Sequence, residues 1–263
     1  RMGRTFQSPE GKGVYLSVIL RPGCKPEELM HLTCAVAVAM CDAVENAFGF
    51  DHFRWQKEQN LHIDQPFRAD GLHRILYKCV HCGEEGTMLG KGTTISCSHC
   101  GKTWELTPLG QLQALEGETE FSHIPDWYAW ERQEVKKEID RGEYRLDTPV
   151  QIWLMVDYKG LYMVGDGWLT HSKDGFRLTG CKGKLNYEQK PLMSHTLNAD
   201  FYWYCIGDVI GIGNRDCLYY CFPTAPDGKI PPVAKARLAT EELYKVAMAE
   251  RRRPRRTDKP QKG

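Results

Sequence analysis

The middle of this 263-residue chain carries two matching motifs, Cys79-Val80-His81-Cys82-Gly83 and Cys97-Ser98-His99-Cys100-Gly101. Fourteen residues, 83–96, separate the two cysteine pairs. The glycine of each motif permits a tight turn in which backbone amides point at the thiolates. Four thiolates in two such pairs suit a tetrahedral zinc ion and leave no position open for water. We therefore predict a structural metal site at Cys79, Cys82, Cys97 and Cys100, which adds about 10–16 kcal/mol of binding free energy to folding.

Two other interpretations of these motifs stay open at this point. The cysteines could form two disulfides or a redox pair, and His81 or His99 could replace a sulfur ligand. The other cysteines lie in apolar or aromatic surroundings, as reduced packing thiols do; they are Cys24, Cys34, Cys41, Cys181, Cys205, Cys217 and Cys221. A long chain with eleven cysteines, an odd number, is not typical of a secreted disulfide scaffold. Zinc binding is therefore favoured.

Composition and local patterns indicate the compartment and the organisation before the motifs. No stretch has the roughly 20 apolar residues that span a bilayer, and no leader precedes a cleavage site, so we expect a cytoplasmic protein. Residues 13–20 form a β-branched and aromatic run typical of a strand. A helix is predicted from Pro26 to Phe48, closed by Gly49 and apolar on most sides. Residues 51–73 show no clear period and are predicted to be a linker.

The segments after the linker predict further domains: a ribbon at 74–110, a connecting helix within 121–142, a β-rich domain at 147–249 and a basic disordered tail at 250–263. Short alternating runs at 8 to 12 residue spacing are typical of an antiparallel barrel or sandwich. A helix from Pro232 to about Met248 would close that domain, in a pleckstrin-homology-like arrangement. The predicted class is α+β: a partial α/β segment at 1–50, a rubredoxin-like zinc ribbon, and this β barrel or sandwich.

The charges of the chain are nearly balanced, with 35 Lys and Arg against 34 Asp and Glu. A balanced body gives little electrostatic reason to bind nucleic acid, and the acidic segment 116–120 after the ribbon also disfavours it. The tail differs, because Arg251 to Arg256 form a basic run that could contact an anionic membrane surface. A solvated tail is the alternative.

The beginning of the chain, Arg1-Met2-Gly3-Arg4, together with the strand at 13–20 and the Ala/Val-rich helix, resembles the start of the catalytic domain of bacterial biotin protein ligases. In that family a Gly/Arg-rich loop closes over biotinoyl-adenylate, and Arg1, Gly3 and Arg4 match its last residues. The resemblance implies ATP-dependent activation of biotin and its transfer to a lysine of a biotin carrier protein. The family's K-W-P-N-D strand and later lysine have no counterpart after Phe50, so no catalytic residue is assigned.

From Asp51 onward the chain resembles the C-terminal accessory region of Firmicutes-type 1-acylglycerol-3-phosphate acyltransferases. The residues that carry this resemblance are 51–60, 66–72, the two cysteine motifs, 117–128, 202–204 and 237–244. It implies a non-catalytic module of phospholipid synthesis that contacts an acyltransferase core. Because the chain begins at Arg1 without methionine, we expect the ligase-like segment to be truncated.

Two further patterns are interpreted as chance. His195 and Asp200 have the H-x4-D spacing of acyltransferases but stand in a strand-rich region, and residues 86–92 fail the P-loop pattern. The sequence thus predicts a composite of a ligase-like segment and a zinc-ribbon/β accessory module. An acyltransferase regulatory region and a nucleic-acid-binding ribbon are the alternatives, and whether the chain is an enzyme is left open.

Overall fold

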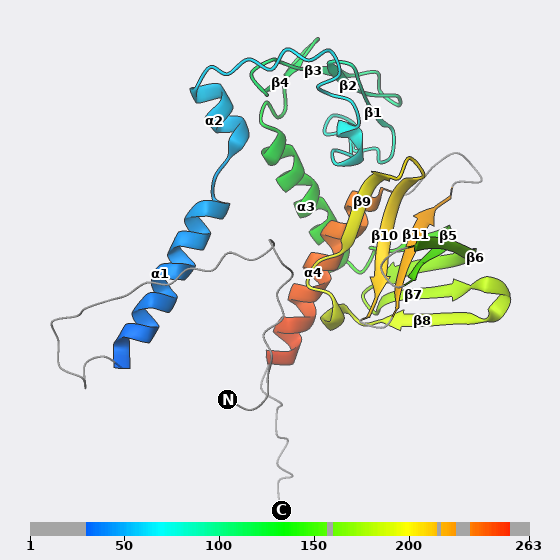
Figure 1. Cartoon of the computed structure of the whole chain (residues 1–263). Coiled ribbons are helices and arrows are strands. Elements are labelled where there is room, and N and C mark those ends of the chain that lie inside the picture. Colours follow the sequence, from blue (N-terminus) through cyan, green and yellow to red (C-terminus); the bar gives the residue numbers. More distant parts are fainter. Residues whose placement is uncertain (1–29, 157–159, 215–216, 225–231, 253–263) are drawn as a thin grey trace, which may run out of the picture. The chain divides into compact units, whose positions relative to one another are not determined.

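Helices and antiparallel sheets make up the chain in its computed structural model, which confirms the α+β class (Figure 1). The structure describes residues 30–156, 160–214, 217–224 and 232–252. The chain divides into two compact units, Arg1–Asp51 and His52–Gly263. The expected strand at 13–20 and the tail beyond residue 252 lie outside the described residues.

Helix α1 (Met30–Phe48) is the described element of the first unit. It ends where the sequence predicts, because the Gly49 amide donates to the Glu45 carbonyl at 2.8 Å and closes the last turn. Large apolar side chains along the helix remain exposed, namely Val36, Val38, Met40, Val44 and Phe48.

The second unit begins with a small antiparallel sheet of strand order β1-β2-β3-β4. Its elements are α2 (His52–Glu58), η2 (Leu72–Arg74), β1 (Met88–Lys91), β2 (Thr94–Cys97), β3 (Thr103–Leu106) and β4 (Leu112–Ala114). Strands β2 and β3 alternate half-buried and buried residues, and Ile95 and Trp104 lie opposite each other in the core. The second cysteine motif begins at the last residue of β2, and the first motif lies between η2 and β1.

Most of the predicted linker 51–73 packs on this ribbon instead. The Gln56 amide in α2 donates to the carbonyls of Leu61 and Pro108, at 3.1 and 2.9 Å. The Ala69 amide donates to the Gly92 carbonyl at 2.9 Å, which covers the edge of β1. Sequence periodicity misses such a segment because its hydrogen bonds reach residues far along the chain.

Helix α3 (Ile124–Asp140) joins the ribbon to the larger sheet (Figure 1). A proline stands in its first turn, and Gly142 follows its end with a φ of 72°, both typical of helix ends. Trp127 on α3 packs edge-on against Trp104 of the ribbon, with 5.0 Å between ring centroids.

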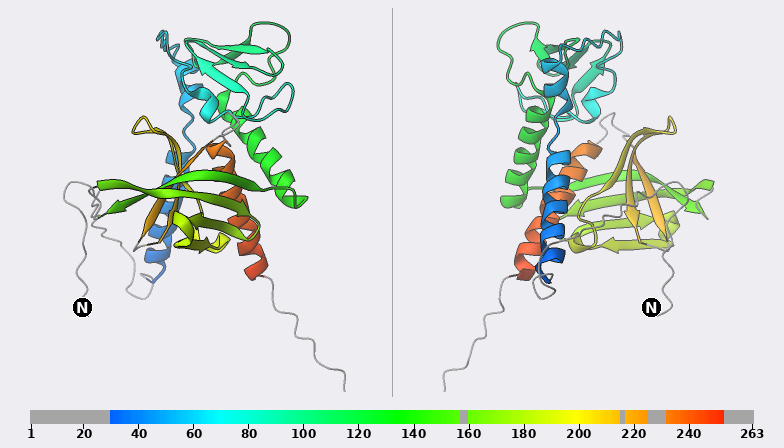
Figure 2. Two further views of the ribbon diagram at one scale, coloured as in Figure 1. Left: turned by 90° about the vertical axis from the view of Figure 1, so that its right-hand side faces the viewer. Right: turned by 60° about the vertical axis from the view of Figure 1, so that its left-hand side comes forward.

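A seven-stranded antiparallel sheet of order β8-β7-β6-β5-β11-β10-β9 follows (Figure 2). The strands are β5 (Leu146–Val156), β6 (Gly160–Ser172), β7 (Gly175–Gly180), β8 (Leu185–Gln189), β9 (Asn198–Trp203), β10 (Gly207–Gly213) and β11 (Leu218–Pro223), with η3 (Cys181–Gly183) and η4 (Pro191–Met193) between them. Helix α4 (Val233–Arg252) lies against one face, where Val233 and Ala236 join the core of Ile152, Leu178 and Ile210.

The prediction of a barrel is wrong, because the sheet does not close. Strands β8 and β9 are its two edges and share no ladder in the described part of the chain. Two side chains of β8 reach the far strands. Gln189 Oε1 accepts from the Gly213 amide at 2.8 Å, and the centroids of the Tyr187 and Tyr219 rings lie 5.2 Å apart. Helix α4 contacts β9, β10 and η4, so it packs beside one of the two edges of the sheet.

Helix α4 is tied to α3 and the ribbon by charged side chains that are mostly withdrawn from solvent. Lys235 Nζ lies 2.7 Å from Glu85 of the ribbon and 2.8 Å from Glu138 of α3. Arg132 of α3 pairs with Glu241 at 2.6 Å. The ribbon, α3 and the sheet therefore belong to one unit. Over the described ranges, no helix has the length and apolar character needed to cross a membrane.

Candidate metal centre

The four predicted cysteines converge at one point of the ribbon. Their sulfur atoms all lie within 4.8 Å of one another. Two of the distances are 3.8 Å, from Cys79 to Cys100 and from Cys82 to Cys97, and all four thiols are free. A disulfide would require sulfurs about 2 Å apart, so this arrangement is not a pair of disulfides. The cluster could hold a metal ion.

Backbone geometry around the sulfurs follows the prediction from the glycines. Gly83 and Gly101 have φ values of 77° and 79°, in the left-handed region that favours glycine. Their amides donate to the carbonyls of Cys79 and Cys97, each at 2.8 Å. Each motif thus folds as a tight turn that brings the second cysteine back to the first.

Amide groups inside these turns point at the first sulfur of each pair. Burial raises the pKa of the Cys79 thiol, and hydrogen bonds from the amides of Cys82 and His81 oppose that rise. At Cys97 burial is outweighed by hydrogen bonds from the Thr87 hydroxyl and two amides, which lower the pKa of Cys97 to about 6. The Thr87 oxygen lies 3.3 Å from this sulfur. Cys97 therefore favours the thiolate, the form that binds metals.

Glu120 connects the two cysteine turns from outside the sulfur cluster. Its Oε1 lies 3.1 Å from Nδ1 of His81, a residue of the first motif. The same oxygen lies 2.6 Å from Nζ of Lys102, the residue that follows the second motif in the sequence. Its Oε2 accepts from the Trp104 indole at 3.1 Å. Partial burial acts the other way, yet the hydrogen bonds from Lys102 and Trp104 lower the pKa of Glu120. Glu120 is thus an anion that braces both turns against the ribbon core.

Two buried side chains of α3 hydrogen-bond to the backbone of Lys78, the residue just before the first motif. The Trp127 indole donates to the Lys78 carbonyl at 3.0 Å, and Glu131 Oε1 accepts from the Lys78 amide at 2.9 Å. Glu131 is fully buried, which raises its pKa well above the usual value. Lys78, next to Cys79 in the chain, is thereby anchored at both its backbone polar groups.

The other predicted site residues are placed as follows. Arg1, Gly3 and Arg4 lie outside the described residues. His81 and His99 are exposed, and the cluster of close metal-binding atoms in the described chain contains cysteines alone. The redox interpretation of the motifs predicts two separate pairs, whereas the structure brings all four sulfurs together.

The two patterns interpreted as chance form no site. The His195 ring faces Tyr244 edge-on at 6.2 Å, while the Asp200 carboxylate accepts from the Phe201 amide at 2.8 Å. Residues 86–92 form the β1 arm and turn of a hairpin, and β2 rather than a helix follows them. A phosphate-binding P-loop would require a helix there.

Sequence reasoning missed Glu120 as a member of this site. The segment 116–120 attracts notice only for its negative charge. Its partners His81 and Lys102 stand 39 and 18 residues away along the chain, so no local spacing reports them.

Comparison with known proteins adds one partial similarity. The chain is 37% identical over 59 residues to "Bifunctional ligase/repressor BirA" of Bacillus subtilis (strain 168). The match covers 22% of this chain and 18% of that relative's length. No family model and no solved structure matches the chain. The similarity supports a partial resemblance to biotin ligases, and no comparison supports the resemblance to acyltransferases.

Proposed function

We propose that Cys79, Cys82, Cys97 and Cys100 bind one structural zinc ion. Four sulfurs held ~2.3 Å from a common centre in a tetrahedron lie ~3.8 Å from one another. The distances from Cys79 to Cys100 and from Cys82 to Cys97 have this value. Thiolate ligands in a tetrahedral set suit zinc or iron, and four of them leave no position for a reacting water.

The chain as a whole, in this proposal, is a composite of a biotin ligase-like segment and a zinc-ribbon/β accessory module that binds rather than catalyses. The 37% identity to BirA over 59 residues supports the first part. The convergence of four sulfurs carries the second part. The division of the chain into units at Asp51 is consistent with two parts of different origin.

The ligase-like segment would take part in ATP-dependent activation of biotin and its transfer to a lysine of a carrier protein. Arg1 and Arg4 would neutralise the phosphate of biotinoyl-adenylate, and Gly3 would let the backbone approach it. With 18% of the relative's length present, the remaining catalytic elements would have to come from outside this sequence.

Metal analysis and ligand-dependent unfolding test the two parts separately. The purified full chain should contain one equivalent of zinc, and Cys97→Ser should lose it while the exposed Cys205→Ser retains it. Biotin with ATP should raise the melting temperature of the full chain, and Arg4→Gln should remove that increase. Absence of stoichiometric zinc or iron would exclude the metal centre. An unchanged melting temperature at saturating biotin and ATP would exclude adenylate binding by this chain.

A second candidate is the accessory region of a 1-acylglycerol-3-phosphate acyltransferase. The observation that favours it is the compact unit His52–Gly263, which has its own cores and no His195–Asp200 dyad among the described residues. Such a region would bind an acyltransferase core, with the basic tail at an anionic membrane surface. Co-purification with a co-expressed acyltransferase core would support it, and binding to oligonucleotides would instead favour a nucleic-acid-binding ribbon.

A further inference from the structure

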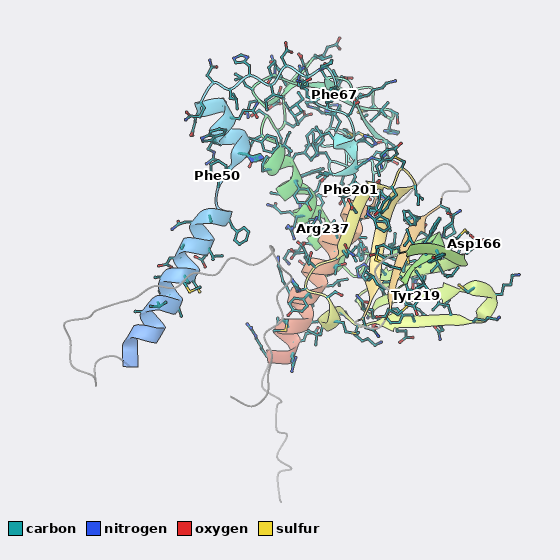
Figure 3. The ribbon with its side chains drawn as sticks, in the orientation of Figure 1. Phe50, Phe67, Asp166, Phe201, Tyr219 and Arg237 are labelled. Carbon is teal, nitrogen blue, oxygen red and sulfur yellow. The ribbon has the colours of Figure 1, made fainter. Side chains whose placement is uncertain are left out.

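A groove runs between the ribbon and the β9–β10 hairpin of the second unit. Two adjoining cavities form it, of about 440 and 530 Å3, and both are lined by His73, Arg74 and Tyr202. Volumes of this size are typical of small-molecule sites. Phe201 on β9, at the end of the sheet that faces the ribbon, lines the larger cavity (Figure 3).

Hydrogen-bond donors converge at the junction of the two cavities. The Arg74 guanidinium lies over the Tyr202 ring, 5.1 Å from its centroid, and its Nη1 pairs with the Asp208 carboxylate. The other guanidinium nitrogens, Nε and Nη2, have no hydrogen-bond partner among the described residues. Because arginine carries five N–H groups, several donors remain open to the groove.

His73 adds a donor of defined tautomer. Its Nδ1 accepts from the Gly90 amide at 2.9 Å, so the ring proton resides on Nε2. Burial, followed by the nearby Arg74 charge, lowers the pKa of His73, which keeps the ring neutral at pH 7. A neutral ring with Nδ1 occupied offers one N–H donor and no acceptor.

The carboxylates of the groove are already engaged with backbone amides. Asp208 Oδ1 accepts from the Tyr202 amide at 2.9 Å as well as from Arg74. Asp70 Oδ1 accepts from the Gly92 amide at 2.5 Å. The formal charges of Asp70 and Asp208 balance those of Arg74 and Lys91, so any preference for an anion comes from the open donors rather than from net charge.

The rest of the smaller cavity is mostly apolar. Its further lining includes Met88, Ile206, Phe222, Pro223 and Pro232. The Tyr202 and Ile206 side chains are 56% and 42% exposed, so their apolar surface is open to a ligand. Tyr202 has a φ of 53°, in a conformation that L residues rarely adopt, and it presents its ring beneath Arg74.

We propose that this groove binds a small amphipathic anion. Its carboxylate or phosphate oxygens accept from Arg74 and His73, and its apolar body lies on Tyr202 and along the smaller cavity. This site is separate from the metal centre and does not depend on the ligase-like segment.

Calorimetric titration of the zinc-loaded full chain with four small probes tests whether binding needs the anionic group, the apolar body or both. Octyl phosphate and octanoate, both below their micellar concentrations, carry an anion and an apolar body. Inorganic phosphate carries only the anion, and octanol carries only the apolar body. We expect saturable one-to-one binding of octyl phosphate or octanoate, weakened by salt, and at least about tenfold weaker binding of the two partial probes.

Two substitutions at the ion pair should have opposite effects. Arg74→Gln removes the donors and should weaken octyl phosphate or octanoate binding at least about tenfold. Asp208→Asn removes the competing carboxylate, keeps an oxygen for the Tyr202 amide, and should strengthen binding about threefold. If Arg74 only joins the ribbon to the sheet, the two variants lose the same ion pair and change binding alike.

Exposed Arg177 on β7 supplies the matched control, because Arg177→Gln should leave affinity unchanged. Thermal unfolding of each variant separates loss of binding from loss of fold, and Asp208→Asn remains informative if Arg74→Gln does not fold. Equal binding by wild type, Arg74→Gln and Asp208→Asn, or no binding of either octyl probe by wild type, would overturn the proposal.

Discussion

The ribbon and the seven-stranded sheet of the second unit are stabilised in different ways. The ribbon strands have three or four residues each, and its core residues Cys79 and Cys97 are themselves members of the sulfur cluster. The sheet has strands of up to 13 residues and a core of aliphatic side chains under α4. The ribbon also has an apolar core around Ile95, Trp104 and Trp127, and a metal bound as we propose would add to its stability. Among its described residues, the sheet has an apolar core without such a cluster of sulfurs.

Removal of the metal should have the largest effect, because it should unfold the ribbon and leave the sheet folded. In an excess of chelator we expect the ribbon to unfold, because about 10–16 kcal/mol of binding free energy is lost, while the sheet retains cooperative unfolding. Near-ultraviolet circular dichroism should report loss of the Trp104–Trp127 packing, and far-ultraviolet signals of the sheet should persist. A full chain that keeps the near-ultraviolet spectrum without metal would contradict this prediction.

Acid should act on the sheet through His171. This residue is buried, stacks on Phe176 at 3.6 Å, and lies with Nδ1 3.0 Å from the Tyr144 hydroxyl. Burial lowers the pKa of His171 to about 3, so the folded sheet binds fewer protons than the unfolded chain. Stability should therefore be complete above pH 6.5 and fall below it, by about 3 kcal/mol at pH 4.

Urea unfolding of the sheet between pH 7 and pH 4 measures this effect. His171→Gln should flatten the pH dependence, whereas His195→Gln, at an exposed position, should retain the wild-type slope. Equal slopes in wild type and His171→Gln would assign the acid sensitivity to other groups.

The smallest expected effect concerns Glu120, whose carboxylate contacts His81 and Lys102 beside the proposed metal site. Glu120→Gln weakens the contacts with His81 and Lys102, and we expect zinc transfer to a chromogenic chelator to be about tenfold faster. Glu118→Gln is the matched control, since Lys102 contacts only the backbone carbonyl of Glu118. The cobalt(II) absorption spectrum checks that all four sulfurs still bind. Equal transfer rates would mean that Glu120 is dispensable for metal retention.

Much of the fold could be predicted where interactions are local. The helix before Gly142 follows from its proline and glycine, and the β-rich segment follows from alternation and turn residues. The open form of the sheet could not be predicted, because it depends on which strands pair across long stretches of chain, such as β5 with β11. The packing of Gln56 and Ala69 on the ribbon was missed for the same reason.

Local sequence accounts for each cysteine pair, because each Cys-x-x-Cys-Gly turn brings its own two sulfurs together through local backbone geometry. The meeting of the two pairs in one cluster, the side chains around that cluster and the position of the groove all depend on tertiary packing. Arg74 and Asp208 are 134 residues apart along the chain, and Glu120 reaches back 39 residues to His81. Contacts of that span arise from the packing of whole elements, which no spacing in the sequence encodes.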